Sequence, residues 1–339
     1  MSRKPIIAAN WKMNIGPAEG AQFIESFKTI LKGKAVACDT VIVPPYTTIP
    51  SGLNALGCGG CFASGAQNVS QYDNGAYTGE ISTSMLQELG LKYVVLGHSE
   101  RRQYFGETAA IITAKITKAI AAGITPIFCI GETKDERLGG ILEPVLEIQL
   151  KGGLKDLTPE EVANLVIAYE PVWAIGTGLT ATSKEAQEAH AFIRKVVADV
   201  FGADTAARVR IQYGASEKRE NVEELMSEPD IDCALVGGAS LKPESFAARG
   251  TAAKSAASHH SFLPPGRSLR GPAFSVSGEH APAVSVPDAR FGKRLLSGAV
   301  PMPYTGRMHR PPCGQARSWG GTGTTSFRKK GVPHRHRGP

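Results

Sequence analysis

Eight short apolar segments recur along residues 1–250, and longer segments with a helical pattern lie between them. The apolar segments are rich in β-branched and aromatic residues, as expected of strands that are covered on both faces. Such alternation predicts an α/β protein with a parallel sheet, and eight strands favour a closed (β/α)8 barrel. The predicted strands are Ile6–Ala9, Thr40–Val43, Phe62–Ala66, Tyr93–Leu96, Pro126–Cys129, Leu165–Tyr169, Val209–Tyr213 and Cys233–Val236.

Apolar residues at helical spacing mark the predicted helices between these strands. In the first helix Phe23, Phe27 and Ile30 share one face. The alternative architecture is an open, doubly wound sheet. No G-x-G-x-x-G motif follows the first strand, which weakens a dinucleotide-binding version of that alternative. Three predicted helices carry the pattern most clearly: Ala18–Leu31, Thr108–Ala122 and Lys184–Phe201.

Residues 251–339 differ from the predicted barrel, residues 1–250, in both charge and composition. They hold 14 Lys and Arg against 2 Asp and Glu, a net charge of +12, whereas residues 1–250 carry −5. The tail also holds 11 Pro and 12 Gly and lacks Ile, so we expect it to be disordered. It is either a translation or gene-model artefact, or a basic extension that binds nucleic acid or an acidic surface. A nucleic-acid partner is therefore an expectation for the tail alone.

The sequence also indicates a compartment. No stretch approaches the roughly 18 apolar residues that cross a membrane, and the apolar run Ile6–Ala9 is shorter than a secretory signal requires. The cysteines are scattered, which fits a reducing compartment, and we expect a cytoplasmic protein. The pair Cys58 and Cys61 has no partner pair at zinc spacing, so no metal site is expected. The six cysteines are Cys38, Cys58, Cys61, Cys129, Cys233 and Cys313.

Several residues that can carry chemistry follow the predicted strands, where a parallel barrel places its functional groups. Asn10 and Lys12 follow the first strand, His98 the fourth and Glu170 the sixth. One lysine, one histidine and one glutamate at separate strand ends suit acid–base chemistry on an anionic substrate. Glycines at the same rim let backbone N–H groups approach a phosphate, namely Gly176, Gly178, Gly237 and Gly238.

Each of these residues also has a purely structural interpretation. His98 can be a loop histidine with satisfied hydrogen bonds, Lys12 a surface charge and the glycines simple turns. Glu170 can be a solvated carboxylate, but the following Pro171 restricts it to extended geometry at a strand end. His190 lies within a helical pattern and is expected to be structural. The functional interpretation depends on all of them occurring together.

Together these segments resemble the triosephosphate isomerase family, and the resemblance runs in family order across residues 4–248. The strongest signature is the string Tyr-Glu-Pro-Val-Trp-Ala-Ile-Gly-Thr-Gly. The segments that carry the resemblance are Ala9–Asn14, Gly65–Asn68, Gly75–Glu80, Gly97–Arg102, Cys129–Glu132, Tyr169–Gly178 and Leu235–Ser240.

The resemblance implies a TIM barrel that interconverts dihydroxyacetone phosphate and D-glyceraldehyde 3-phosphate without a metal or redox cofactor. Glu170 would be the base that removes a proton from the carbon next to the carbonyl. Neutral His98 would polarise the carbonyl oxygens, and Lys12, with Asn10 beside it, would stabilise the enediolate and the phosphate. A base of this kind is typically worth about 10²–10⁴-fold in rate.

The resemblance also implies binding and partner residues. Residues 173–178 would form a closing lid, in which Gly176 donates its N–H to the phosphate. Family members are homodimers, in which Thr78 would reach the site of the neighbouring subunit. Glu100 and Cys129 would support the site. The remaining phosphate ligands would be Ser216, Gly237 and Gly238.

Three residues depart from the family pattern. Ala215 replaces a glycine in the loop after the seventh strand, and a φ above zero there would cost about 1–2 kcal/mol. Glu217 places a negative charge near Ser216. We expect weaker phosphate binding with retained chemistry, so that Glu217→Val would lower KM. Leu179 stands where lysine is common after the lid, and we expect at most a small effect on lid motion.

Overall fold

The computed structural model describes residues 3–34, 36, 38–56, 62–214, 222–232 and 234–250. Several predictions lie outside these residues. They are the disordered tail at 251–339, the phosphate ligand Ser216 with its neighbours Ala215 and Glu217, and the pair Cys58 and Cys61. The boundary between a barrel at 1–250 and a tail remains a prediction for the same reason.

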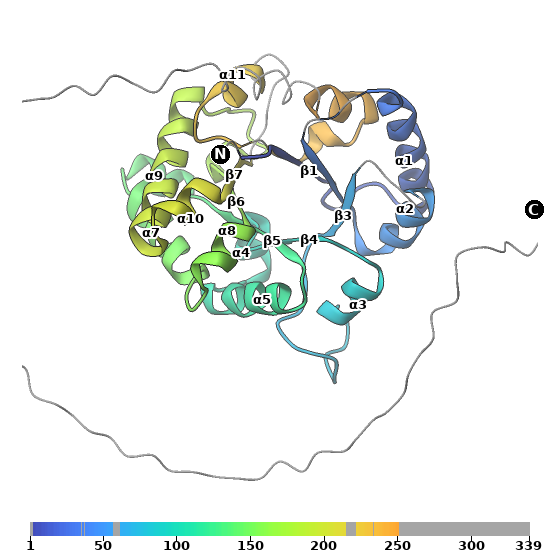
Figure 1. Ribbon diagram of the computed structural model, residues 1–339, viewed down its shortest axis with the longest axis horizontal. Helices are drawn as coiled ribbons and strands as arrows, with labels where there is room; N and C mark the ends of the chain where they lie inside the picture. The colour runs from blue at the N-terminus through green and yellow to red at the C-terminus, as the bar shows by residue number, and fades with distance from the viewer. Residues whose placement is uncertain are drawn as a thin grey trace, which may run out of the picture. The chain divides into compact units, whose positions relative to one another are not determined.

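Eight parallel strands form a closed barrel with helices around it, so the predicted fold is confirmed and the open-sheet alternative is wrong (Figure 1). Neighbours in the sheet follow the order β7-β6-β5-β4-β3-β2-β1-β8. A parallel bridge between Tyr213 and Ala234 joins the two ends of this order. The strands are β1 (Ile6–Asn10), β2 (Asp39–Val43), β3 (Ala63–Ala66), β4 (Tyr93–Leu96), β5 (Thr125–Ile130), β6 (Val166–Tyr169), β7 (Arg210–Tyr213) and β8 (Leu235–Val236).

The helices cover the outside of the barrel. The predicted segments Ala18–Leu31, Thr108–Ala122 and Lys184–Phe201 correspond to α1, α5 and α9, with ends that shift by one residue. Residues 243–250 are also helical. The helices are α1 (Pro17–Leu31), α2 (Ile49–Leu56), α3 (Thr83–Glu88), α4 (Ser99–Phe105), α5 (Ala109–Ala121), α6 (Lys134–Leu138), α7 (Leu142–Gly153), α8 (Pro159–Asn164), α9 (Ser183–Phe201), α10 (Ala203–Arg208) and α11 (Val222–Ser227), with short 3₁₀ turns η1 (Tyr46–Thr48), η2 (Val172–Ala174) and η4 (Gly238–Ser240).

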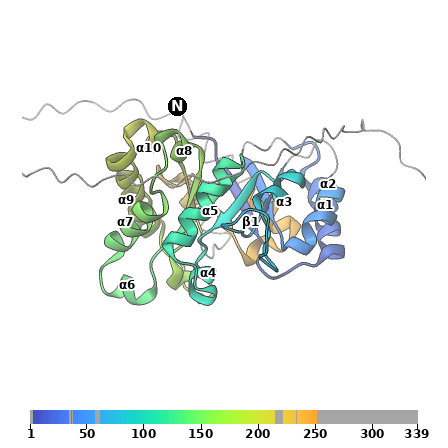
Figure 2. The ribbon, with the colours of Figure 1, turned by 90° about the horizontal axis from the view of Figure 1, so that it is seen from below.

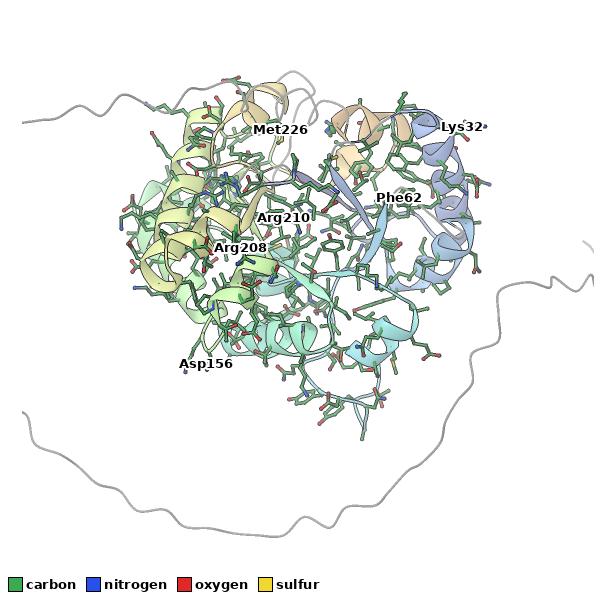
Figure 3. The ribbon with its side chains drawn as sticks, viewed as in Figure 1. Lys32, Phe62, Asp156, Arg208, Arg210 and Met226 are labelled. Atoms are coloured by element: carbon green, nitrogen blue, oxygen red, sulfur yellow. The ribbon has the colours of Figure 1, made fainter. Side chains whose placement is uncertain are left out.

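The strands are buried on both faces, which explains their continuous apolar sequences. Alternate residues such as Ile6 and Ala8 belong to one small cluster that fills the barrel, whereas Ile7 and Ala9 belong to the larger cluster beneath the helices. Phe62 lies in this outer layer, where its ring meets that of Phe27 on α1 (Figure 3). Burial on both faces fixes the register of each strand, because a shift by one residue would exchange the two layers.

An ionic network ties the strands together where they begin. The carboxylate of Asp232 accepts hydrogen bonds from Arg3 at 2.6 Å and from Arg194 at 2.9 Å. Arg210 donates to Asp39 at 2.8 Å, joining β7 to β2 across the barrel (Figure 3). The helices α4 and α6 lie at the other end of the barrel, where the strands finish (Figure 2). In a parallel barrel, residues where the strands begin contribute to stability, and the functional groups lie where the strands end.

Among the described residues, no helix has both the length and the apolar character that a membrane span requires. The longest helix, α9, begins at a capping box in which Thr182 and Glu185 satisfy each other's backbone N–H groups.

His190 on α9 is buried in the core, which agrees with the structural role that its place in a helical pattern predicts. Its side chain is fully buried, and its Nδ1 lies 2.7 Å from the carbonyl oxygen of Ala186. Burial lowers the pKa of His190 to about 4, against 6.5 in an unfolded chain. Between these values the unfolded chain binds a proton that the folded chain does not, so stability falls as pH falls through this window.

We therefore expect His190→Gln to reduce the loss of stability between pH 6.5 and pH 4. The slope of the unfolding free energy should differ from that of the wild type by about 1.4 kcal/mol per pH unit, the effect of one proton. Urea denaturation of both proteins at equal concentration and several pH values measures it. Parallel curves for the two proteins across this window would contradict a neutral His190.

Candidate active site

Glu170 lies at the end of β6 with its carboxylate buried in the barrel rim. Its backbone N–H donates to the carbonyl of Ile130 at the end of β5, at 2.7 Å. The side chain is 2% exposed, and Oε2 accepts the backbone N–H of Ser99 at 2.9 Å. Oε1 lies 3.0 Å from Nε2 of His98. These contacts hold an almost desolvated carboxylate in one orientation.

His98 sits at the start of α4, and the helix defines which ring nitrogen carries the proton. The backbone N–H of Glu100 donates to Nδ1 of His98 at 3.2 Å. An imidazolium has no free lone pair for that bond, so the geometry favours a neutral ring with its proton on Nε2. The positive end of the helix dipole acts in the same direction. His98 therefore presents an N–H donor to the interior of the site.

Burial and pairing have opposite effects on the two groups. Burial alone would lower the pKa of His98, but the charge and hydrogen bond of Glu170 outweigh it and raise that pKa. Burial alone would raise the pKa of Glu170, but His98, Ser99 and Lys12 outweigh it and lower that pKa. Glu170 is therefore ionised at neutral pH. A ligand that separates the pair removes the effect of Glu170 on His98 and leaves burial, which favours the neutral ring.

Lys12 follows β1 in a strained conformation that its neighbours hold in place. Its φ of 51° is unusual for a residue with a side chain and costs about 1–2 kcal/mol. Gln67 donates to the carbonyls of Lys12 at 2.8 Å and Val43 at 3.1 Å, and Lys12 N–H donates to Asn10 Oδ1 at 3.0 Å. The ammonium lies 2.5 Å from the carboxylate of Glu100. Such local strain at a rim cavity is typical of a functional group.

These residues surround a cavity of about 580 Å³ at the rim. The structure brings together eight of the predicted site residues. Sequence reasoning did not single out Tyr104, which also lines the cavity. Ile175 of the predicted lid and Gly214 after the seventh strand line it as well. The predicted residues that meet there are Asn10, Lys12, His98, Glu100, Glu170, Gly176, Gly237 and Gly238.

Two other predicted residues lie away from this cavity. Cys129 is fully buried inside the barrel behind Glu170, and burial raises the pKa of its thiol well above 9.0. It is therefore a neutral packing residue and not a nucleophile. Thr78 is exposed on the long connection between β3 and α3. That connection extends away from the barrel (Figure 1), so Thr78 does not reach the cavity of its own chain.

The predicted lid is anchored beside the cavity by Glu132. Trp173 Nε1 donates to Oε1 of Glu132 at 2.7 Å, and the Tyr169 hydroxyl lies 3.1 Å from the same oxygen. Gly176 and Gly178 have φ values of 69° and 79°, which side chains rarely adopt. Glycine therefore suits these two positions of the segment, and Glu132 holds the start of the segment.

The contacts that the sequence did not predict are made by backbone groups and by side chains on other elements. No sequence pattern marks the N–H of Ser99 as a ligand of Glu170. Gln67 lies in a segment quoted for the resemblance, but its hydrogen bonds to Lys12 require the fold. Within the described ranges, no group of three His, Cys, Asp or Glu is arranged to hold a metal ion.

Comparison with known proteins gives a consistent result. The triosephosphate isomerase family profile matches residues 5–252. The triosephosphate isomerase of Carboxydothermus hydrogenoformans is 53% identical over 246 residues, which cover 73% of this chain and 97% of the relative. Those of Symbiobacterium thermophilum and Herpetosiphon aurantiacus are 51% and 52% identical, over 73% and 72% of this chain and 95% and 97% of the relatives.

The support of Lys12 by Gln67 gives a testable prediction. Gln67→Met keeps the length of the side chain but leaves the carbonyl of Lys12 without its donor, whereas the carbonyl of Val43 still accepts the N–H of Trp11. The substitution should destabilise the protein by about 1–3 kcal/mol. It should also weaken binding of inorganic phosphate to the cavity, because the backbone of Lys12 is released. Denaturation and titration calorimetry measure the two effects. Unchanged phosphate binding would contradict the supporting role.

Proposed function

Because this chain belongs to the triosephosphate isomerase family and interconverts dihydroxyacetone phosphate and D-glyceraldehyde 3-phosphate, we propose that Glu170 is the base of that reaction. The carboxylate removes a proton from the carbon next to the substrate carbonyl. The C–H electrons form the double bond of an enediolate, and the carbonyl oxygen takes the negative charge. Glu170 then returns a proton to the neighbouring carbon, while the hydroxyl proton of the enediolate moves to the oxygen that took the charge, so that the carbonyl forms at the other carbon. The observation that carries this proposal is the ionised, buried carboxylate held by Ser99 and His98.

His98 has the role of an electrophile in this proposal. Its Nε2–H points into the cavity, and a substrate oxygen that replaces the Glu170 carboxylate would accept its hydrogen bond. A fixed donor aimed at developing charge in a water-poor site stabilises the transition state without reorganisation. Glu170 carries the proton between the two substrate carbons, and the hydroxyl proton passes from one substrate oxygen to the other. One carbon is oxidised as its neighbour is reduced, so this chemistry requires no redox cofactor.

The phosphate group is proposed to bind at the opposite side of the cavity. Lys12 supplies the cation, and Gly176, Gly237 and Gly238 allow close approach of backbone N–H groups. An arriving phosphate would exchange with the carboxylate of Glu100 at the Lys12 ammonium. Ser216 and Asn10 keep their predicted binding roles. This arrangement supports anion binding by a barrel whose net charge is −5, because the donors act locally.

A homodimer is the proposed assembly. The tip of the connection between β3 and α3 carries Tyr72 and Tyr77, whose rings stack at 4.2 Å, and Lys118 holds Asp73 at 2.6 Å. Exposed aromatic residues on a braced loop suit a protein partner more than solvent. A second copy would place Thr78 at the neighbouring site.

We place the protein in the cytoplasm. We also propose that the barrel domain ends near residue 250 and that residues 251–339 form a tail. Cys38 and Cys129 are free thiols among the described cysteines, which fits a reducing compartment. The family match ends at residue 252, close to the proposed domain boundary. Nucleic-acid binding by the tail remains a prediction that rests on its charge of +12.

Replacement of the base gives the direct test of mechanism. Glu170→Gln keeps the shape of the side chain but cannot accept a carbon-bound proton, so kcat should fall by about 10²–10⁴-fold. A coupled assay for glyceraldehyde 3-phosphate measures the rate. Circular dichroism and thermal unfolding should show an intact fold. A folded variant with a near-normal kcat would exclude Glu170 as the base.

The dimer proposal makes a separate prediction. Sedimentation should give about twice the chain mass of 35.9 kDa. Tyr77→Lys adds a charge at the exposed loop tip and should shift the protein towards monomer, with a parallel loss of activity. Val200→Lys on α9, a residue of similar exposure, is the matched control and should leave the dimer intact. Equal behaviour of the two variants would place the interface elsewhere.

A further inference from the structure

Three consecutive residues at the end of β5 support both the base and the lid. The carbonyl of Ile130 accepts the backbone N–H of Glu170 at 2.7 Å. The carbonyl of Glu132 accepts the N–H of Val172 at 3.1 Å, two residues beyond the base. Gly131 lies between them, and a Cβ on it would overlap the backbone carbonyl of Glu170. The position of the Gly131 backbone therefore sets where the main chain of Glu170 lies.

One side chain from an outer helix holds Gly131 on both of its polar groups. The Gly131 N–H donates to Oε1 of Gln149 at 2.8 Å, and Nε2 of Gln149 donates to the Gly131 carbonyl at 2.9 Å. A planar amide that binds both groups of one residue fixes its orientation as well as its distance. Gln149 is half-buried on α7, between the buried residues Leu146 and Leu150.

Close packing of α7 on β5 makes this contact possible. Gly153 lies one turn after Gln149, and a Cβ on it would overlap the ring of Phe128. The helix therefore approaches the strand at its backbone, and the amide of Gln149 reaches the strand end three residues beyond Phe128. Interiors transmit displacement because they are densely packed, so a change at Gln149 moves Gly131.

We propose that Gln149 is a positioning residue for the isomerisation. It acts through Gly131 on the main chain of Glu170 and on the anchor of the lid at Glu132, without contact with the substrate. This inference rests on the proposed role of Glu170 as the base. The reaction is sensitive to it because displacement of a catalytic group by about 1 Å costs up to 10²-fold in rate.

The test compares two glutamines that make equivalent contacts. Gln149→Met keeps the length of the side chain and removes both hydrogen bonds. Gln187→Met on α9 is the matched control, because Gln187 also donates one hydrogen bond, to the carboxylate of Asp230, and accepts one, from the backbone N–H of Asp230. We expect similar small decreases in Tm for both variants. Only Gln149→Met should lower kcat, by about 10- to 100-fold, with KM within about threefold of the wild type.

The outcomes separate this inference from the proposed function. An active wild type whose kcat is unchanged by Gln149→Met overturns the positioning role and leaves Glu170 as the base. Equal losses of kcat in both glutamine variants also overturn it, because the effect is then one of general stability. An inactive wild type, or a fully active Glu170→Gln, instead overturns the proposed function.

A second variant keeps the test decisive if Gln149→Met does not fold. In Gln149→Glu the ionised carboxylate still accepts the Gly131 N–H but cannot donate to the carbonyl. Protonation restores that donor, so kcat relative to the wild type should rise several-fold as pH is lowered from 8 to 5. A ratio that does not change with pH in this range would overturn the positioning role.

Discussion

Closure of the parallel sheet is the constraint on which the site depends. Lys12, His98, Glu170 and Gly237 follow strands that are far apart in the sequence, and only a closed ring brings their ends to one cavity. The ring closes through the pairing of β1 with β8 and the bridge from Tyr213. Because all strands are parallel, every connection that follows a strand lies at the same rim. The ionic network around Asp232 holds the opposite ends of the strands and so protects this closure.

Opposed electrostatic effects then tune the residues at the rim. Burial would neutralise Glu170, but the donors around it keep the carboxylate ionised. The same carboxylate raises the pKa of His98, while the helix start and the N–H of Glu100 favour its neutral form. A low-dielectric cavity strengthens each of these interactions. In the proposed mechanism, a substrate that enters between the two groups therefore meets a base on one side and a neutral donor on the other.

The fold and much of the candidate site can be predicted from the sequence, because buried strands and charged residues at strand ends leave recognisable patterns. Strands buried on both faces have continuous apolar sequences, so the predicted bounds Tyr93–Leu96 match those of β4 and the other predicted strands differ by one or two residues at their ends. Charged residues at strand ends, such as Glu170 before a proline, can also be recognised in the sequence as candidate functional residues. The N–H of Ser99 and the amide of Gln149 could not be predicted in this way. A backbone donor has no residue identity, and a contact between helix and strand depends on packing distances that the sequence does not state.

Isomerisation in D₂O tests the central claim, proton transfer through Glu170, most directly. A carboxylate that holds the removed proton exchanges it with solvent, whereas a hydride moved directly between the two carbons does not exchange. Nuclear magnetic resonance of product and recovered substrate locates the label. We expect deuterium on the carbon next to the carbonyl after turnover. Product that forms at the full rate and contains no deuterium would contradict the base mechanism.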